Sequence, residues 1–429
     1  MLDLLTAPDL LLTNVRLIDP ATGLDQPGQL LVRNGLIADF GPSLGRAEVP
    51  TLDGDGAVLC PGLVDMRAAL GEPGYEYRET IASAAIAAAS SGITTLAALP
   101  DSLPAIDDPA LVRLLRARGE ETGSLTILPY GAVTRGCAGV EMAEIGLLRE
   151  AGAVAFTDGR RAIGDSRMMR HVLSYARGFG ARIVQHPEDP GLADGGAATE
   201  GELATRLGLP GIPAAAEAIL VARDIRLAQL TGGALHFAHV STAEAVALIR
   251  QAKADGVDVT CDTAPPYFDL NETAIGDFRT YAKLSPPLRP EADRVAICAA
   301  LADGTIDAVA SDHQPRDADD KRLPFALASP GGAGLATLLG VTLAQVHGNG
   351  LPLMHALDLL TARPARVLGS SAGRLVKGGP ADLCLFDLER IWKVEAGQLP
   401  GKAPNTPFDG RALEGRVIGT WKAGRRVFG

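Results

Sequence analysis

Residues 61–74 read PGLVDMRAALGEPG. Its first half continues an apolar run that begins at Val58, and its second half contains the glycines and prolines that typically end a strand. We therefore predict a strand from Val58 to Met66. Because side chains alternate along a strand, Arg67 and Ala69 are expected on one face at its carboxyl end.

Further along, short β-like runs alternate with helical segments rich in alanine and leucine up to about residue 371. Such alternation predicts parallel strands that are joined by helices, and eight repeats indicate an α/β fold of the (β/α)8 barrel type. The expected strands are Val58 to Met66, Ile93 to Leu99, Leu125 to Tyr130, Ala153 to Thr157, Arg182 to His186, Leu235 to His239, Val257 to Cys261 and Ala308 to Ser311.

The clearest predicted helices run from Glu79 to Ala89 and from Thr242 to Lys253. Ser241 or Thr242 is expected to cap the second helix, because a hydroxyl oxygen can accept a free backbone N–H there. The segment Pro187 to Glu202 is rich in Gly, Ala and Asp, which predicts a mobile loop over the barrel mouth.

Both ends of the chain show strand patterns. Asn34-Gly35 lies between two alternating apolar runs, which is a strong hairpin signal. Near the carboxyl end, Ala381 to Phe386 and Val417 to Trp421 are predicted strands, and Gly424 is expected in a turn before Val427-Phe428.

Composition excludes several classes of protein. Of 429 residues, 47% are hydrophobic and 21% charged, so the chain can bury a large core. The formal charge of −11 argues against nucleic acid or an anionic membrane as a partner. The five cysteines are far apart, without a C-x-x-C pair, which favours free thiols in a reducing compartment.

Two segments bear on targeting. The leucine-rich start carries Asp3 and Asp9 and has no basic residue before Arg16, unlike a signal peptide. The uncharged run from Pro324 to Val346 is interrupted by prolines and glycines, so we expect a loop followed by a barrel helix there and a cytoplasmic protein.

The chain resembles the class I dihydroorotases of the amidohydrolase superfamily. The resemblance rests on stretches in the family's order: residues 61–74, 152–158 (GAVAFTD), 185–188 (QHPE), 236–242 (HFAHVST), 283–289 (KLSPPLR), 303–313 and 405–410 (NTPFDG). It implies a barrel over 57–371 and one small β-sandwich that residues 1–56 and 372–429 build together.

The resemblance also implies roles for side chains at the carboxyl ends of strands. Asp158, His186 and His239 match metal ligands of the family, and Asp312 matches the general base that takes a proton from metal-bound water. A divalent ion lowers the pKa of its water and polarises the scissile amide, and a carboxylate accepts the proton. Two imidazoles and one carboxylate could still hold one zinc ion.

Six positions depart from the family pattern. Arg67 and Ala69 stand where the family has a His-x-His pair, and neither side chain offers a lone pair to a metal. The other departures are at positions that grip the substrate or flank the site: Gly71 for arginine, Asp101 for asparagine, Ser285 for asparagine and Arg316 for histidine.

Two functions remain open. The first is a dihydroorotase-like protein of pyrimidine biosynthesis without turnover, which acts as a structural partner of aspartate transcarbamoylase, as a homo-oligomer or both. In it, Arg67 is expected to replace the metal by bonding to both Asp158 and Asp312. The second is a working cyclic amidohydrolase with one zinc on His186 and His239, acting on dihydroorotate or another cyclic amide.

Overall fold

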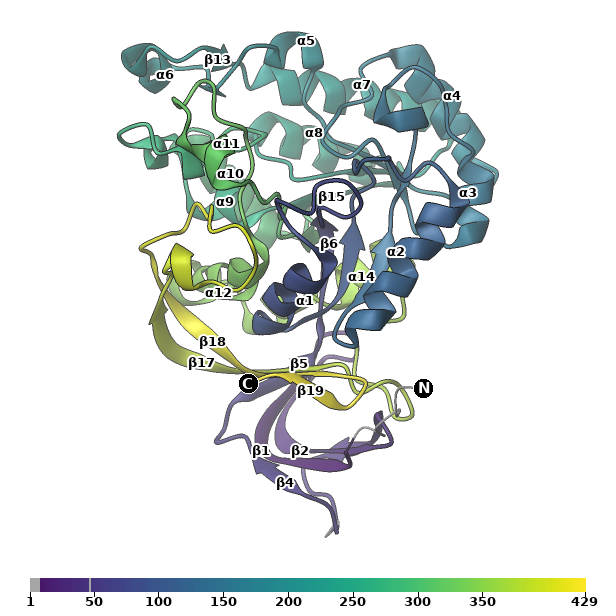
Figure 1. Cartoon of the computed structure of the whole chain (residues 1–429), viewed down its shortest axis with the longest axis vertical. Coiled ribbons are helices and arrows are strands. Elements are labelled where there is room, and N and C mark those ends of the chain that lie inside the picture. Colours follow the sequence, from purple (N-terminus) through teal and green to yellow (C-terminus); the bar gives the residue numbers. More distant parts are fainter. Residues whose placement is uncertain (1–7, 46–47) are drawn as a thin grey trace.

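A computed structural model of the chain describes residues 8–45 and 48–429 (Figure 1). Asp3, on which the reading of the amino-terminal segment partly depends, lies outside the described residues. Figure 1 shows a helix-covered barrel in the upper part of the molecule and, below it, a sheet that contains strands from both chain ends.

The barrel has eight strand positions, which confirms the predicted fold class. Seven parallel pairings join neighbouring positions in chain order, and a bridge between Ala68 and His313 links the last position to the first. Tyr130 interrupts the third position, which is therefore divided in two. The strands are β6 (Leu63–Ala68), β7 (Ile93–Ala98), β8 (Thr126–Pro129) with β9 (Gly131–Ala132), β10 (Phe156–Thr157), β11 (Ile183–Gln185), β14 (Leu235–Phe237), β15 (Val259–Thr263) and β16 (Ala308–Val309).

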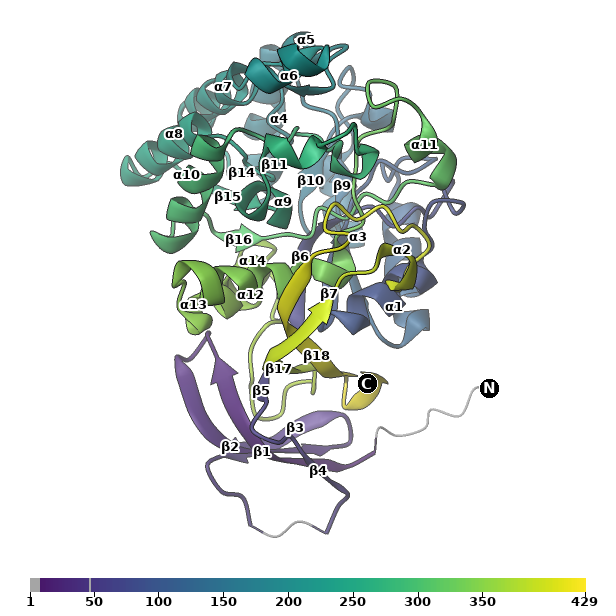
Figure 2. The ribbon, with the colours of Figure 1, turned by 90° about the vertical axis from the view of Figure 1, so that its left-hand side faces the viewer.

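One long helix follows each strand position and lies on the outside of the barrel (Figure 2). Thr242 caps the sixth of these helices by accepting a hydrogen bond from the N–H of Ala245, as predicted. The helices are α1 (Ile81–Ser90), α2 (Pro109–Thr122), α3 (Ile145–Ala151), α4 (Ser166–Arg177), α7 (Ala215–Thr231), α8 (Ala243–Ala254), α10 (Glu291–Ala302) and α12 (Leu338–Asn349).

Shorter helices lie in the loops, and some of them close one end of the barrel. They are α5 (Pro190–Ala193), α6 (Glu202–Leu207), α9 (Pro265–Asp269), α11 (Ala318–Arg322), α13 (Leu353–Asp358) and α14 (Ala362–Val367). Ala365 of α14 and Leu368 pack with Val64 and Val184 in the barrel interior. The barrel is therefore a packed core, with room for chemistry only at its opposite, carboxyl end.

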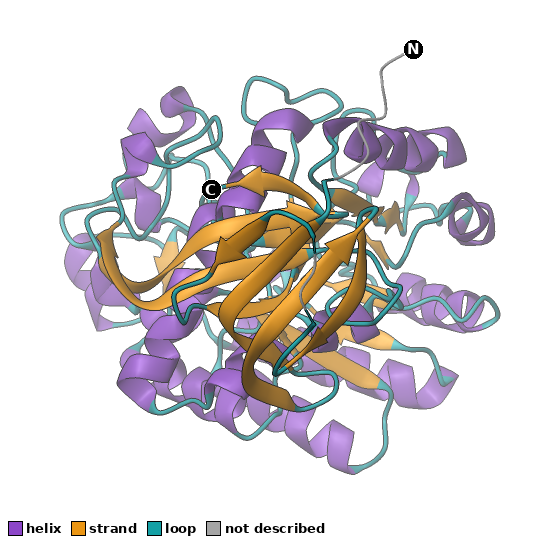
Figure 3. Ribbon diagram, turned by 90° about the horizontal axis from the view of Figure 1, so that it is seen from below, coloured by secondary structure: helices purple, strands orange, loops and turns teal. Residues whose placement is uncertain are grey.

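Strands from both chain ends share one mixed sheet, in the order β19-β18-β17-β5-β1-β2-β3, and β4 pairs with β1. Asn34 and Gly35 both have positive φ (49° and 79°), as a two-residue type I′ hairpin turn requires. Seen from below, this sheet lies across the ring of barrel helices (Figure 3). The strands are β1 (Leu10–Asp19), β2 (Leu24–Arg33), β3 (Leu36–Gly41), β4 (Thr51–Asp53), β5 (Val58–Pro61), β17 (Leu383–Lys393), β18 (Ala412–Lys422) and β19 (Arg425–Phe428).

The predicted single strand from Val58 to Met66 is wrong, because two strands occupy this run. β5 pairs with β1 and β17 in the sheet of the chain ends, whereas β6 pairs with β7 in the barrel. Gly62 separates them, and a Cβ there would lie 2.2 Å from Thr94 Oγ1. The chain can therefore pass between the two sheets only with glycine at this point.

The predicted loop from Pro187 to Glu202 contains regular structure. Helix α5 starts at Pro190, where Asp189 caps it, and β12 (Ala198–Thr199) pairs with β13 (Gly211–Ile212). Residues 324–334 form a loop and residues 338–346 lie in α12, as the predicted loop followed by a barrel helix requires. Within residues 8–45 and 48–429, the helices are all too short or too polar to cross a membrane.

Candidate active site

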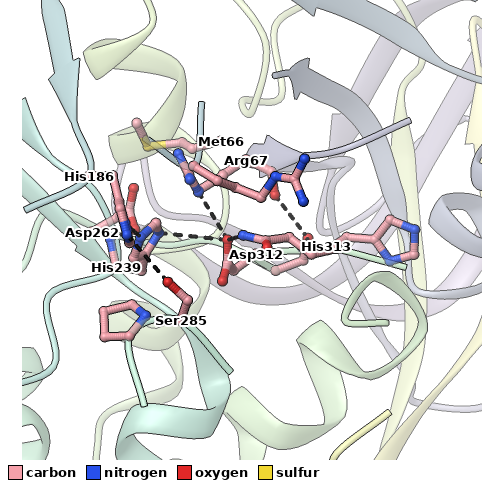
Figure 4. Close-up of polar contacts among 12 residues, drawn as sticks. Met66, Arg67, His186, His239, Asp262, Ser285, Asp312 and His313 are labelled. Atoms are coloured by element: carbon pink, nitrogen blue, oxygen red, sulfur yellow. Dashed lines mark hydrogen bonds and ion pairs between the residues drawn. The ribbon is translucent and has the colours of Figure 1, made fainter. Parts of the chain in front are cut away.

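Arg67 is the central side chain of the barrel mouth (Figure 4). It lies at the end of β6, where strand alternation turns its side chain into the barrel, and it is only 1% exposed. Its Nε donates to Oδ1 of Asp312 at 2.9 Å, and its Nη2 donates to the carbonyl oxygen of Gly159 at 3.0 Å. A buried guanidinium is thus fixed between the ends of β10 and β16.

The expected bond from Arg67 to Asp158 is wrong. The carboxylate of Asp158 instead accepts hydrogen bonds from the N–H groups of Val133 and Thr134 and from the Thr134 hydroxyl, at 2.5 to 3.0 Å. These donors follow β9, so Asp158 holds the adjacent loop. The structure does not bring this carboxylate to the two predicted histidine ligands.

His186 and His239 do come together. They follow β11 and β14, and Nδ1 of His186 lies 2.6 Å from Nε2 of His239, so one imidazole donates a hydrogen bond to the other. Nδ1 of His239 lies 3.6 Å from Oδ1 of Asp312. Burial, reinforced by the positive charge of Arg67, lowers the pKa of His239 well below its usual value, so this ring is neutral at pH 7.

Asp312 receives two donors, Arg67 Nε and Nε2 of Gln314 at 2.8 Å. Burial raises the pKa of Asp312, and the neighbouring guanidinium opposes that shift. The guanidinium makes Asp312 a weaker proton acceptor than burial alone would, although the pKa of Asp312 stays above its usual value. Asp312, the predicted general base, therefore forms an ion pair with Arg67.

The remaining departures from the family pattern each have a local reason. Gly71 has φ +72°, and a Cβ at this position would lie 2.2 Å from the carbonyl oxygen of Glu79. An arginine therefore cannot replace Gly71 on this backbone. Ala69 contributes only its N–H, which donates to the carbonyl oxygen of His313.

The polar replacements find partners that the sequence pattern did not reveal. Asp101 pairs with Arg160 at 2.5 Å, and this pairing lowers the pKa of Asp101 against the effect of burial, which is the largest single influence. The hydroxyl of Ser285 lies 3.1 Å from Oε2 of Glu188 and 3.4 Å from Nε2 of His186.

Arg316 bonds away from the histidine pair. Its Nε donates to the carbonyl oxygen of Pro330, and its backbone N–H donates to Oδ1 of Asn405. Burial lowers the pKa of Arg316 to about 10. Arg316 therefore holds the loop from α11 to α12 against the segment near residue 405.

Sequence reasoning assigned no role to Glu188, Gln314 and Arg160, although each bonds to a predicted site residue. The signal for Glu188 and Gln314 was their position two residues beyond His186 and Asp312. Arg160 offered no such signal, because its partner Asp101 lies 59 residues away in the chain.

His236 bonds inside the barrel to Asp262 and Thr260, at 2.9 and 2.8 Å. The same Asp262 accepts the N–H of His239 at 2.6 Å. His239 also has a positive φ of 39°. Asp262 therefore positions the backbone of His239 for its contact with His186.

The space beside these groups is small. A cavity of about 10 Å³ borders Ser311 and Asp312, and one of about 30 Å³ borders Arg160, Gln314 and Arg316. A single water needs about 10–15 Å³, and pockets for small molecules usually exceed about 300 Å³. A larger cavity of about 540 Å³ borders Asp101, Asp158 and Arg160 of the same barrel mouth.

The donor set does not fit a divalent metal ion. Two ligands of a tetrahedral zinc ion lie roughly 3.3 Å apart, since each Zn–N bond is about 2.0 Å, whereas the facing nitrogens of His186 and His239 are hydrogen-bonded at 2.6 Å. The neighbouring position holds the cation of Arg67. In the described part of the chain, three or more His, Cys, Asp or Glu side chains nowhere form a group that could hold a metal ion.

Comparison with known proteins places this geometry in a family. A family model described as dihydro-orotase-like matches residues 56–245. The dihydroorotase of Pelobacter propionicus is 44% identical over 421 residues, which cover 98% of this chain and 99% of that protein. The dihydroorotase of Syntrophus aciditrophicus is 42% identical over 421 residues, with the same coverage.

Solved structures of other proteins have the same fold as this chain. L-hydantoinase (dihydropyrimidinase) from Arthrobacter aurescens has a TM-score of 0.87 and 25% identity, covering 98% of this chain and 96% of that one. The dihydropyrimidinase from Brevibacillus agri has a TM-score of 0.84 and 22% identity, covering 98% and 95%. The near-complete match to curated dihydroorotases decides the assignment: the chain belongs to the dihydroorotase-like family.

Proposed function

We propose that this chain is a dihydroorotase-like protein of pyrimidine biosynthesis whose own barrel mouth does not turn over substrate, and that it serves as a structural partner of aspartate transcarbamoylase. One observation supports the loss of turnover: Arg67, which stands where the resemblance implies a metal ligand, forms an ion pair with Asp312, which matches the general base of the family. Membership of the family supports the pathway.

The hydrogen bonds among the residues of the barrel mouth support this proposal. Hydrolysis of an amide requires an activated water and a base that takes its proton. Oδ1 of Asp312 is bonded to the Arg67 cation, which disfavours proton uptake by this carboxylate, and His186 and His239 are bonded to each other. The cavity of about 10 Å³ beside Asp312 is too small for a ring-shaped substrate, and the cavity of about 540 Å³ borders Asp101 and Asp158 instead.

The second candidate is an active cyclic amidohydrolase, with dihydroorotate or another cyclic amide as substrate. The full-length similarity to proteins named dihydroorotase favours it over the first, whereas the geometry of this chain's own side chains favours the first. The two candidates differ in a measurable rate.

The deciding experiment is an assay of carbamoyl aspartate cyclisation and of dihydroorotate hydrolysis, with and without added zinc. The proposal expects no rate above that of an Asp312→Asn variant under any of these conditions. A zinc-dependent rate that Asp312→Asn abolishes would establish the second candidate instead.

The partnership requires its own test. The purified chain is mixed with the aspartate transcarbamoylase of the same organism and separated by size-exclusion chromatography with light scattering. Co-elution at a mass that fits a fixed stoichiometry is expected. Separate elution at micromolar concentrations of both proteins would reject the structural role.

A further inference from the structure

A second cavity lies at the end of the barrel opposite the candidate active site. Its volume is about 340 Å³, and four arginines line it: Arg149, Arg177, Arg182 and Arg366. They come from the ends of α3, α4 and α14 and from the residue before β11. The amino ends of β11, β14 and β15 form its floor, near Ala181, Ala234 and Asp258.

The charge of this cavity is not balanced. Asp258 is the only acidic residue in its lining, and it already pairs with Arg182 at 3.1 Å. Arg149, Arg177 and Arg366 form no ion pair with any carboxylate of residues 8–45 and 48–429. Three uncompensated positive charges around one cavity stand out in a chain whose formal charge is −11.

Hydrogen bonds to the backbone hold three of the guanidinium groups in place. Nη1 of Arg149 donates to the carbonyl oxygens of Ala153 and Val154, and Nη1 of Arg177 donates to that of Thr231. Nη1 of Arg182 donates to Leu235 O. Arg149 and Arg177 are anchored through Nη1, which leaves further N–H donors for a ligand, whereas Arg182 is also bonded to Asp258 through Nη2.

Helix ends alone account for part of this pattern, because a cation in the last turn of a helix offsets the helix dipole. That effect explains one arginine at a time. Arg149, Arg177 and Arg366 all lie in the last turn of a helix, but this effect does not explain why they line one cavity together with Arg182, which precedes a strand. The cavity size also falls in the range of small-molecule sites.

From this convergence we propose that the cavity binds a multiply charged phosphate ligand, such as the triphosphate group of a nucleotide. Planar guanidinium groups match phosphate oxygens with paired hydrogen bonds. Three free arginines suit a ligand with about three negative charges better than a single phosphate. The lining of this cavity does not include Arg67 or Asp312, so the proposal does not depend on whether the barrel mouth is catalytic.

The test is isothermal titration calorimetry of the full-length chain at low ionic strength, with inorganic triphosphate and with ATP as separate probes. Both Arg177→Gln and Arg366→Gln are expected to weaken binding about 10- to 100-fold, as the loss of one charge-assisted contact predicts. Arg113→Gln is the matched control, because Arg113 is an exposed arginine on α2, outside the cavity lining.

The two probes separate the sources of the ligand. Tighter binding of ATP than of inorganic triphosphate would identify a nucleotide, and equal binding would identify the phosphate groups alone. Failure of both probes to bind at millimolar concentration would overturn the site. Binding that Arg177→Gln and Arg366→Gln leave unchanged would overturn it equally, since the arginines would then not be the ligands.

Discussion

Nε of Arg67 and Oδ1 of Asp312 lie 2.9 Å apart at the carboxyl ends of β6 and β16, where the first and last barrel positions meet. The two side chains are separated by 245 residues in the chain. Their ion pair therefore ties the ends of the barrel together at the place where family members are expected to hold a metal.

Removing only the cation is predicted to be costly. Arg67→Met leaves Asp312 buried without a positive partner, and loss of one member of a buried pair costs about 3–5 kcal/mol of unfolding free energy. Urea unfolding measures this. Arg67→Met combined with Asp312→Asn should recover most of the loss, while a double variant as unstable as the single one would mean that Arg67 acts through packing alone.

Metal content should depend on the first strand. After dialysis, the wild-type chain is expected to retain well below one zinc per chain by atomic emission. Arg67→His together with Ala69→His supplies two imidazoles beside His186 and His239, and this variant should bind zinc more tightly. A wild-type chain that keeps a stoichiometric zinc ion would contradict the assignment of Arg67 as the replacement cation.

Gly71 is predicted to tolerate no side chain. Gly71→Ala places a methyl group 2.2 Å from the carbonyl oxygen of Glu79, at a φ of +72°. Gly256→Ala is the matched control, since Gly256 has a φ of +76° but open space around it. The control should lose about 1 kcal/mol from the backbone conformation alone, and Gly71→Ala should lose clearly more in urea unfolding. Equal losses would refute the steric argument.

Lys321 should make stability depend on pH. Its Nζ donates to the carbonyl oxygens of Thr280, Lys283 and Ser329, and burial lowers its pKa from 10.5 to about 7. Between pH 7 and pH 10.5, Lys321 therefore carries a proton in the unfolded chain but not in the folded chain. The unfolding free energy of the wild type should therefore rise with pH above 7, relative to Lys321→Met.

The expected slope of that difference is at most about 1.4 kcal/mol per pH unit. Urea unfolding at pH 7, 8 and 9 measures it, with Lys393→Met as the control for an exposed lysine. Below pH 7 both states carry the proton, and the difference should become constant. A difference that stays flat from pH 7 to 9 would show that Lys321 remains charged in the fold.

The barrel could be predicted because its strands and helices have different hydrophobic periods, which are local properties of the sequence. The boundary at Gly62 could not, because an apolar run does not reveal which sheet each half joins. Thr94, whose side chain leaves no room for a Cβ at residue 62, is 32 positions later in the chain.

The candidate site was likewise predictable from the sequence only in part. His186, His239 and Asp312 lie near one another, as their positions at strand ends indicate, because the carboxyl ends of barrel strands meet at one mouth. The partner of Asp158 was not foreseen, since the hydroxyl of Thr134 reaches it from the neighbouring strand position. Pairings between different barrel positions depend on three-dimensional packing, which strand patterns do not encode.

The position of β5 has a consequence for how the protein is made. β5 is hydrogen-bonded on one side to β1 and on the other to β17. The ribosome releases β17 only after the entire barrel has been synthesised, so one edge of β5 stays unpaired until then. Barrel folding during translation precedes closure of that edge, and a nascent chain stalled before residue 383 would expose it to other polypeptides.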